Sequence, residues 1–257
     1  MSTFGFVQAR MGSTRLPGKV LEPLAGRPAV ARVLERVARA PGIDGVALLT
    51  SDTPGDEPLR RFGEELGVPV VAGSHEDVLD RFQLAATRLG AETIVRVTAD
   101  CPLVDAEVLG ELVELYADAP GLDYAGIATG AVAARAGLCR YPDGLDGEIF
   151  SAAALARAWE RASDPYEREH VTPFMWRKPE NFELGLLQAP EDLGEERWTI
   201  DHASDLAFVR AVYERLAERE PFGYRDVLDL LAREQALRGI NAAERDGAAP
   251  ARQDQPR

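Results

Sequence analysis

Short apolar runs alternate with amphipathic segments over roughly the first 120 residues of this chain. Apolar runs of four to eight residues predict strands, and apolar residues at helical spacing predict amphipathic helices. The expected strands are 3–9, 45–51, 68–73 and 92–100, and the expected helices are 28–40, 56–67, 76–90 and 105–119. Strands that alternate with such helices indicate a parallel sheet with right-handed crossovers. We therefore expect an α/β fold, Rossmann-like and doubly wound, with a mostly parallel sheet and helices on both faces.

The second half of the chain has a less regular pattern. A Pro142-Asp143-Gly144 turn lies between two short strand-like runs. Further along, the pattern predicts helices over 151–162, 166–176, 203–219 and 224–238, and strands over 182–188 and 196–200. Because no change of composition marks an internal linker, we expect a single domain over 1–241 with an irregular C-terminal half. The tail 242–257 has almost no apolar content beyond alanine, so we expect it to be disordered.

Charge and cysteine content argue against several classes of protein. The formal net charge is −14, whereas broad nucleic-acid binding needs a basic surface. Neither a signal-peptide pattern nor an apolar run of membrane-spanning length is visible. The two cysteines, Cys101 and Cys139, lack a CxxC spacing and indicate neither a disulfide framework nor a zinc site. We expect a cytoplasmic protein that binds neither nucleic acid nor a membrane.

One short loop concentrates positive charge in this acidic chain. The stretch "QARMGSTRLPGK" holds Arg10, Arg15 and Lys19 directly after the first expected strand. Ligands of open parallel sheets bind beyond the carboxyl ends of the strands, where this loop is expected to lie. Gly12 permits close backbone approach, Ser13 adds a hydroxyl donor, and the cations suit phosphate oxygens. Neither GxxxxGK[ST] nor GxGxxG is present, so we favour a phosphate-binding loop of another kind over a solvated turn.

Two aspartates follow apolar runs in similar surroundings. Asp100 ends the expected strand 92–100, on the same sheet edge as the cationic loop, where a carboxylate suits Mg²⁺. The alternative is that Asp100 only begins a turn before Pro102. Asp201 likewise follows a strand-like run and precedes a helix. We interpret Asp205, in the first turn of that helix, as structural, and leave open whether His202 is a cap or a ligand.

Several motifs resemble one family in their order along the chain. They are "QARMGSTRLPGKVL", "PLAGRPAVARVLERV", "GSHEDVLDRF", "IVRVTADCPLVD", "YPDGLDGEIF", "DPYEREHVTPFMW" and "WTIDHASDLAFV". Together they resemble the cytidylyltransferase family, which includes the acylneuraminate and Kdo cytidylyltransferases. In pattern the chain is most similar to spore-coat polysaccharide biosynthesis proteins of the SpsF type. The resemblance covers residues 3–235, and the opening motif is its most specific part.

The resemblance implies a nucleotidyltransferase that activates a sugar. A hydroxyl of an acidic or modified sugar would attack the α-phosphorus of a nucleoside triphosphate, most simply CTP, and pyrophosphate would leave. The product would be a CMP-sugar for a surface polysaccharide, and fixed cations would stabilise the transition state. The residues implied in nucleotide binding are Gln8, Ala9, Arg10, Gly12, Ser13, Arg15, Lys19, Arg96 and Thr98.

The resemblance also implies a Mg²⁺ cofactor and a homodimer. The metal ligands would be Asp100 and Asp201, and the catalytic residues would be these two together with Arg15 and Lys19. The less regular second half would supply the surface between subunits. Typical Kdo enzymes carry glutamine at the position of Thr98 and "GDEP" in place of "ADCP", so cytosine, guanine and uracil stay open as the base.

The acceptor sugar would be bound by residues of the second half. Tyr141, Asp143, Asp146 and Glu148 offer hydrogen-bonding groups for a polyol, although Pro-Asp-Gly is also a generic turn. Glu169 and His170 would orient the sugar or form a subunit contact. The alternative for this pair is a local cluster of ion pairs and caps, and the residues alone do not separate the two.

Other functions compete with the nucleotidyltransferase. A metal-dependent glycosyltransferase that uses a nucleotide-sugar donor typically carries a D-x-D pair after a strand, and "ADCPLVD" has none. A protein that senses nucleotides without catalysis would require Lys19 and both aspartates to be misplaced in space. Cys101 has no histidine base nearby in sequence, so we interpret it as a small buried residue rather than a nucleophile.

Overall fold

The computed structural model describes residues 2–130, 133 and 137–247. Its main sheet has seven strands in the order β5-β4-β1-β6-β8-β7-β9. They are β1 Thr3–Gln8, β4 Gly45–Ser51, β5 Val70–Gly73, β6 Thr93–Thr98, β7 Tyr124–Ile127, β8 Glu148–Ser151 and β9 Leu184–Leu187. β8 runs antiparallel to both of its neighbours, and every other pair is parallel. The mostly parallel sheet expected from the sequence is confirmed.

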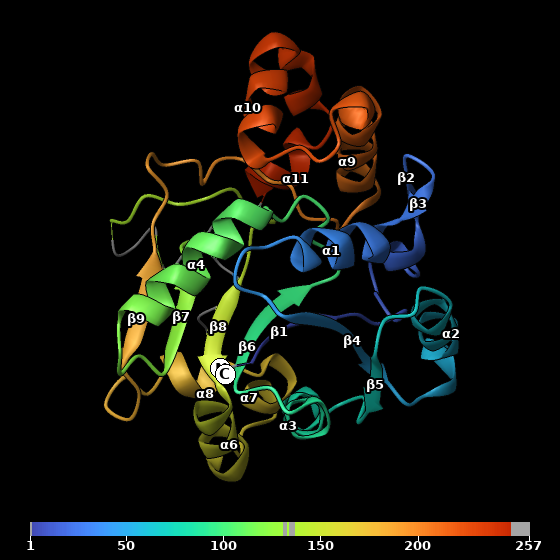
Figure 1. Ribbon diagram of the computed structural model, residues 1–257. Helices are drawn as coiled ribbons and strands as arrows, with labels where there is room; N and C mark the ends of the chain where they lie inside the picture. The colour runs from blue at the N-terminus through green and yellow to red at the C-terminus, as the bar shows by residue number, and fades with distance from the viewer. Residues whose placement is uncertain (1, 131–132, 134–136, 248–257) are drawn as a thin grey trace.

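Helices cover both faces of this sheet (Figure 1). One face carries α1 Ala29–Ala38, α2 Glu57–Glu65, α4 Ala106–Asp118, α9 Ala203–Leu216 and α10 Tyr224–Arg233. The other carries α3 Val78–Leu89, α6 Ala152–Arg161, α7 Pro165–His170 and α8 Pro173–Trp176. Smaller elements are the hairpin β2 Pro23–Leu24 and β3 Arg27–Pro28, α11 Ala242–Gly247, and 3-10 helices at Lys19–Leu21, Pro54–Asp56, Ala217–Arg219 and Gln235–Gly239.

The apolar runs of the first half become central strands because both faces of the sheet are buried. Along β1, Phe6 packs in the core on the α3 side and Val7 in the core on the α1 side, and both are fully buried. Ile94 and Val95 of β6 alternate in the same way. Because β1 and β6 are parallel neighbours in register, their last residues lie side by side. The loops that follow these two strands therefore leave the same edge of the sheet.

The second half departs from the expected elements. β7 was not expected, and the strand expected over 196–200 is reduced to one bridge between Arg197 and Asp143. The helix expected over 166–176 is broken at Val171, whose φ of 72° and ψ of −58° form a γ-turn closed by the Thr172 N–H and the His170 carbonyl, 2.9 Å apart. Thr172 returns to helical backbone, with φ −96° and ψ −15°, and Pro173 takes the first position of α8, where a missing N–H costs no intrahelical hydrogen bond.

The C-terminal end also differs from the expectation. Residues 242–247, expected to be disordered, form α11. Glu244 in this helix contacts His202 and Ser204 at the start of α9. The rest of the expected tail, 248–257, lies outside the described residues. In the part of the chain that the structure covers, no helix combines the length and apolar character required to cross a bilayer.

Candidate active site

The cationic loop after β1 is held by a buried carboxylate that the sequence analysis missed. Asp56 is 2% exposed and accepts the N–H of Met11 at 2.7 Å through one oxygen. Its other oxygen accepts the hydroxyl and the N–H of Ser51 at the end of β4. Burial raises the pKa of Asp56, but the hydrogen bonds from Ser51 and Met11 outweigh it and lower the pKa below its usual value. The loop is therefore tied to the neighbouring strand through an ionised side chain.

Lys19 lies at the end of this loop and joins both expected aspartates. Its Nζ donates to Asp100 Oδ2 at 2.8 Å, to Asp201 Oδ1 at 3.0 Å and to the carbonyl of Ile200 at 2.6 Å. The side chain is buried, which lowers its pKa, but the two carboxylates outweigh the burial and the pKa is raised. The structure thus brings Lys19, Asp100 and Asp201 together as the sequence predicted, although their chemical roles stay predictions.

The two arginines of the loop point to different partners. Arg15 Nη2 lies 3.1 Å from Asp201 Oδ1, and its Nη1 lies 3.5 Å from His202 Nε2. Arg10 instead lies 3.5 Å from Glu169 at the end of α7, with both side chains about half exposed. The loop therefore spans from the Asp201 side of the site to the α7 side, and both guanidinium groups remain accessible to a ligand.

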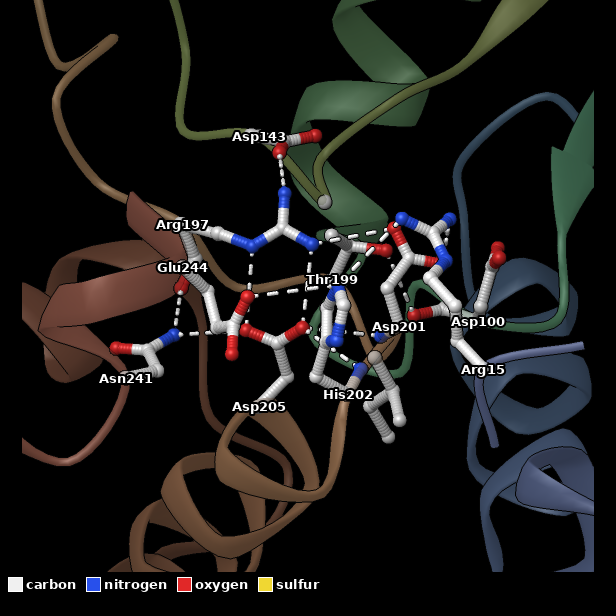
Figure 2. A network of polar contacts seen from close by, with 12 residues as sticks. Arg15, Asp100, Asp143, Arg197, Thr199, Asp201, His202, Asp205, Asn241 and Glu244 are labelled. Atoms are coloured by element: carbon white, nitrogen blue, oxygen red, sulfur yellow. Dashed lines mark hydrogen bonds and ion pairs between the residues drawn. The ribbon is translucent and has the colours of Figure 1, made fainter. Parts of the chain in front are cut away.

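Arg197 is the second residue that sequence analysis missed, and it links three aspartates (Figure 2). It donates to Asp143 at 2.8 Å, to Asp201 Oδ2 at 3.1 Å and to both oxygens of Asp205 at 3.1 Å. Asp205 is fully buried and also accepts the N–H groups of Asp201 and His202. Burial lowers the pKa of Arg197, but Asp205 and Asp143 outweigh it and raise the pKa. Asp205 is structural, as expected, and holds the backbone that presents Asp201.

His202 lies at the start of α9, where its backbone N–H is capped by Asp205. Its ring lies between Arg15 and Glu244, with Nε2 3.4 Å from a Glu244 oxygen (Figure 2). Glu244 belongs to α11, in the tail that we expected to be disordered. The histidine therefore connects the cationic loop to the C-terminal helix.

Glu148 is the centre of a network on the α3 side of the sheet. It accepts a hydrogen bond from Arg96 on the adjacent strand β6 and from the hydroxyls of Tyr124 and Thr172, both at 2.7 Å. Arg96 also donates to Gln8 Oε1 at 3.3 Å. Burial and Glu148 together raise the pKa of Tyr124 well above its usual value, so the phenol stays a donor. The contacts of Arg96 with a base and of Glu148 with the acceptor stay predictions, and both groups already have protein partners.

Thr98 and Cys101 flank Asp100. The Thr98 hydroxyl donates to Asp100 Oδ1 at 2.6 Å, so Thr98 orients this carboxylate. Cys101 is 3% exposed, and burial together with Asp100 raises the pKa of its thiol well above the usual value. A buried, protonated thiol is inert, which agrees with its interpretation as a small core residue.

Asp143 and Asp146 form a second acidic pair close to Asp100 and Asp201. Asp146 accepts the Thr129 hydroxyl at 2.5 Å and the Gly144 N–H at 2.9 Å. Burial and Asp146 raise the pKa of Asp143 to about 7, against the opposing effect of Arg197. Burial likewise raises the pKa of Asp146. A carboxyl group with a pKa near neutrality suits proton transfer from a hydroxyl.

Tyr141 lies in the core, whereas Glu169 and His170 lie at the end of α7, where the roles expected for this pair stay predictions. Tyr141 is 1% exposed, its ring packs 5.7 Å from that of Tyr224, and its hydroxyl lies 3.3 Å from Glu111 on α4. It belongs to the core, so its expected contact with the acceptor is not supported. Glu169 and His170 are exposed at the end of α7. Partial burial of the His170 ring, the rest of which faces solvent, lowers its pKa, with Glu169 opposing and Arg96 adding to the effect.

The remaining predicted residues, Ala9, Gly12 and Ser13, lie at the start of the loop. Ala9 is buried and donates its N–H to Leu49 at 2.9 Å, which fixes the start of the loop on β4. The Ser13 hydroxyl accepts the N–H of Leu16 at 3.3 Å, and a Cβ at Gly12 would meet no neighbour. Within the described residues, no group of three or more His, Cys, Asp or Glu side chains is placed to hold a metal ion. What the site does offer is the pair Asp100 and Asp201.

Comparison with known proteins assigns the chain to a family. The family model described as Cytidylyltransferase matches residues 4–229. The chain belongs to the cytidylyltransferase family. This assignment rests on a match that includes the cationic loop, Asp100, the Asp143–Glu148 segment and Asp201.

Individual relatives cover most or half of the chain. The spore coat polysaccharide biosynthesis protein SpsF of Bacillus subtilis is 33% identical over 235 residues, which cover 88% of this chain and 92% of that protein. The 3-deoxy-manno-octulosonate cytidylyltransferase of Geobacter sulfurreducens is 37% identical over 122 residues, 48% of each chain. The structure of a cytidylyltransferase from Leptospira borgpetersenii superposes with a TM-score of 0.84 over the full length of both chains, at 27% identity.

Proposed function

We propose that this member of the cytidylyltransferase family transfers CMP from CTP to a hydroxyl of an acidic or modified sugar. The observation that carries the proposal is the convergence of Lys19, Arg15, Asp100 and Asp201 where β1 and β6 end. The acceptor oxygen forms a bond to the α-phosphorus, and the bond from that phosphorus to the bridging oxygen breaks, so pyrophosphate leaves. Lys19 and Arg15 stabilise the charge that develops on the phosphate oxygens.

The donor set fits Mg²⁺ as the cofactor. Asp100 and Asp201 present carboxylate oxygens within 3.0 Å of one Lys19 nitrogen, and Mg²⁺ takes one or two carboxylates together with phosphate and water oxygens. Asp100 and Asp201 would hold the ion, which would supply charge neutralisation at the phosphates. Thr98 and Arg197 keep the two carboxylates oriented from the other side.

The acceptor side is proposed to include Asp143 and Asp146. They lie close enough to Asp100 and Asp201 for the carboxylates to raise the pKa of Asp143. The name of the Bacillus relative supports a product destined for a polysaccharide.

We also propose a homodimer, supported by exposed Leu184 and Leu186 on the edge strand β9. The glycosyltransferase alternative gains no observation from the described residues, because Cys101 and Pro102 follow Asp100 where a D-x-D pair would place an aspartate.

The proposed reaction predicts pyrophosphate release that requires both CTP and an acceptor. The assay incubates the purified protein with CTP, Mg²⁺ and a panel of 2-keto-3-deoxy sugar acids, amino sugars and neutral sugars, and measures pyrophosphate. Asp201→Asn should raise the Mg²⁺ concentration needed for half-maximal rate. Transfer from a UDP-sugar, without pyrophosphate release from CTP and any acceptor, would contradict the proposal.

A further inference from the structure

The Lys19 ammonium has no free hydrogen-bond donor. An ammonium group has three N–H donors, and those of Lys19 go to Asp100, Asp201 and the carbonyl of Ile200. The residue is 8% exposed, so water does not compete for these donors. A lysine in this arrangement cannot donate to a phosphate unless it first gives up at least one of its present partners.

The two carboxylates divide their oxygens between Lys19 and other residues. Asp100 gives Oδ2 to Lys19 and holds Oδ1 against the Thr98 hydroxyl at 2.6 Å. Asp201 shares Oδ1 between Lys19 and Arg15 Nη2, which lies 3.1 Å away, and holds Oδ2 against Arg197 at 3.1 Å. Each carboxylate therefore keeps a partner that fixes its orientation if Lys19 leaves. The departure of Lys19 frees Asp100 Oδ2 and leaves Asp201 Oδ1 with only the half-exposed Arg15, so these two oxygens are the ones that another cation would take.

Lys19 and a divalent cation would compete for the same place. The Nζ atom lies between the two inner oxygens, at 2.8 Å and 3.0 Å, and two cations so close would repel each other strongly in a poorly solvated site. The arrangement therefore favours replacement over joint occupancy.

We propose that Lys19 is the resident counter-ion of Asp100 and Asp201 in the nucleotide-free protein and yields this place to a divalent cation. The inference rests on the proposed function for the identity of the ion. Lys19 then turns its ammonium group toward the phosphates, so that metal binding makes the lysine available. Gly18, with a φ of 75°, directly precedes the 3-10 helix Lys19–Leu21. Lys19 is therefore the first residue of this helix, beside the cationic loop.

The first test measures Mn²⁺ affinity without nucleotide, by calorimetry, in the full-length protein. Lys19→Met removes the competing charge and keeps a side chain of similar length, so Mn²⁺ should bind about tenfold tighter or more. The matched control is Lys178→Met, because Lys178 is the only other lysine of the chain and pairs with Glu167 at 3.6 Å, outside the site. Its Mn²⁺ affinity should equal that of the parent. Unchanged or weaker Mn²⁺ binding by Lys19→Met would overturn the proposal.

The second test uses the protein without any substitution, in case Lys19→Met fails to fold. Reductive methylation of the two lysines is followed by mass spectrometry of their separate peptides, with Lys178 as the internal reference. Saturating Mg²⁺ alone should raise the methylation rate of Lys19 several-fold relative to Lys178. A Lys19 rate that Mg²⁺ does not change would refute the exchange. Because this test needs neither CTP nor an acceptor, its result is independent of whether the protein transfers CMP.

Discussion

Lys19→Met should lower the rate of pyrophosphate release from CTP by a factor of about 10²–10³, the scale expected for removal of one charge contact in a transition state. The reason is that Lys19 is the most buried cation of the site and joins both expected metal ligands. The rate constant should fall more than the KM for CTP rises, because the contact strengthens as charge moves onto the leaving pyrophosphate. The measurement is steady-state pyrophosphate release at saturating CTP and Mg²⁺.

Lys178→Met is again the control for this experiment. Lys178 packs on the ring of Phe174 at 3.8 Å, so its removal leaves the site unchanged. Compared with the parent, the Lys19→Met variant should bind Mn²⁺ more tightly in the titration and release pyrophosphate more slowly in the assay. A rate for Lys19→Met within threefold of the parent would remove Lys19 from the chemistry.

Gly144→Ala should destabilise the fold by about 2–5 kcal/mol, the sum of backbone strain and overpacking. The φ of Gly144 is +109°, a conformation that disfavours any side chain, and an added Cβ would lie 2.6 Å from the backbone of both Trp198 and Thr199. Because those atoms are backbone, they cannot move aside as a flexible side chain would. The free energy of unfolding, measured by denaturant titration, gives the effect directly.

Gly55→Ala is the matched control, because a Cβ at Gly55 meets nothing within 4 Å and its φ is not positive. It should change the stability by less than about 1 kcal/mol. Gly144→Ala should in addition weaken activity, because the close approach at Gly144 places Asp143 against Arg197. Equal stability of the two variants would mean that the 142–146 segment does not dock on 197–199.

The sequence was sufficient for the first half of the fold and for the centre of the site. Its strands are buried on both faces, so they appear as continuous apolar runs that are easy to recognise. Lys19 and Asp100 follow two such strands, and parallel neighbours in register bring their ends together. Asp201 was placed through the family resemblance and its strand-like run, although that run forms only a bridge.

The residues that sequence analysis missed act over long separations. Asp56 bonds the N–H of Met11, and Arg197 bonds Asp143, which are 45 and 54 positions apart in the chain. No local pattern distinguishes such charged residues from solvent-exposed ones. Tyr141 was expected in the acceptor site because an amphipathic tyrosine ring suits a substrate pocket as well as the core. In the structure its ring packs against Tyr224 in the core. Strand β7, which lies between β8 and β9, was missed because the run that forms it is short and contains Gly126.

Thermal unfolding with added nucleotides shows whether the site binds CTP together with a divalent cation. The protein is unfolded with CTP, GTP, UTP, ATP, UDP or a UDP-sugar, each with Mg²⁺ and each with EDTA. A ligand at 100 times its dissociation constant stabilises the folded state by about 2.7 kcal/mol, a shift that is easily measured. CTP should stabilise the protein more than the other nucleotides do, and only with Mg²⁺. Stabilisation by UDP or a UDP-sugar, with no response to any triphosphate, would contradict this expectation.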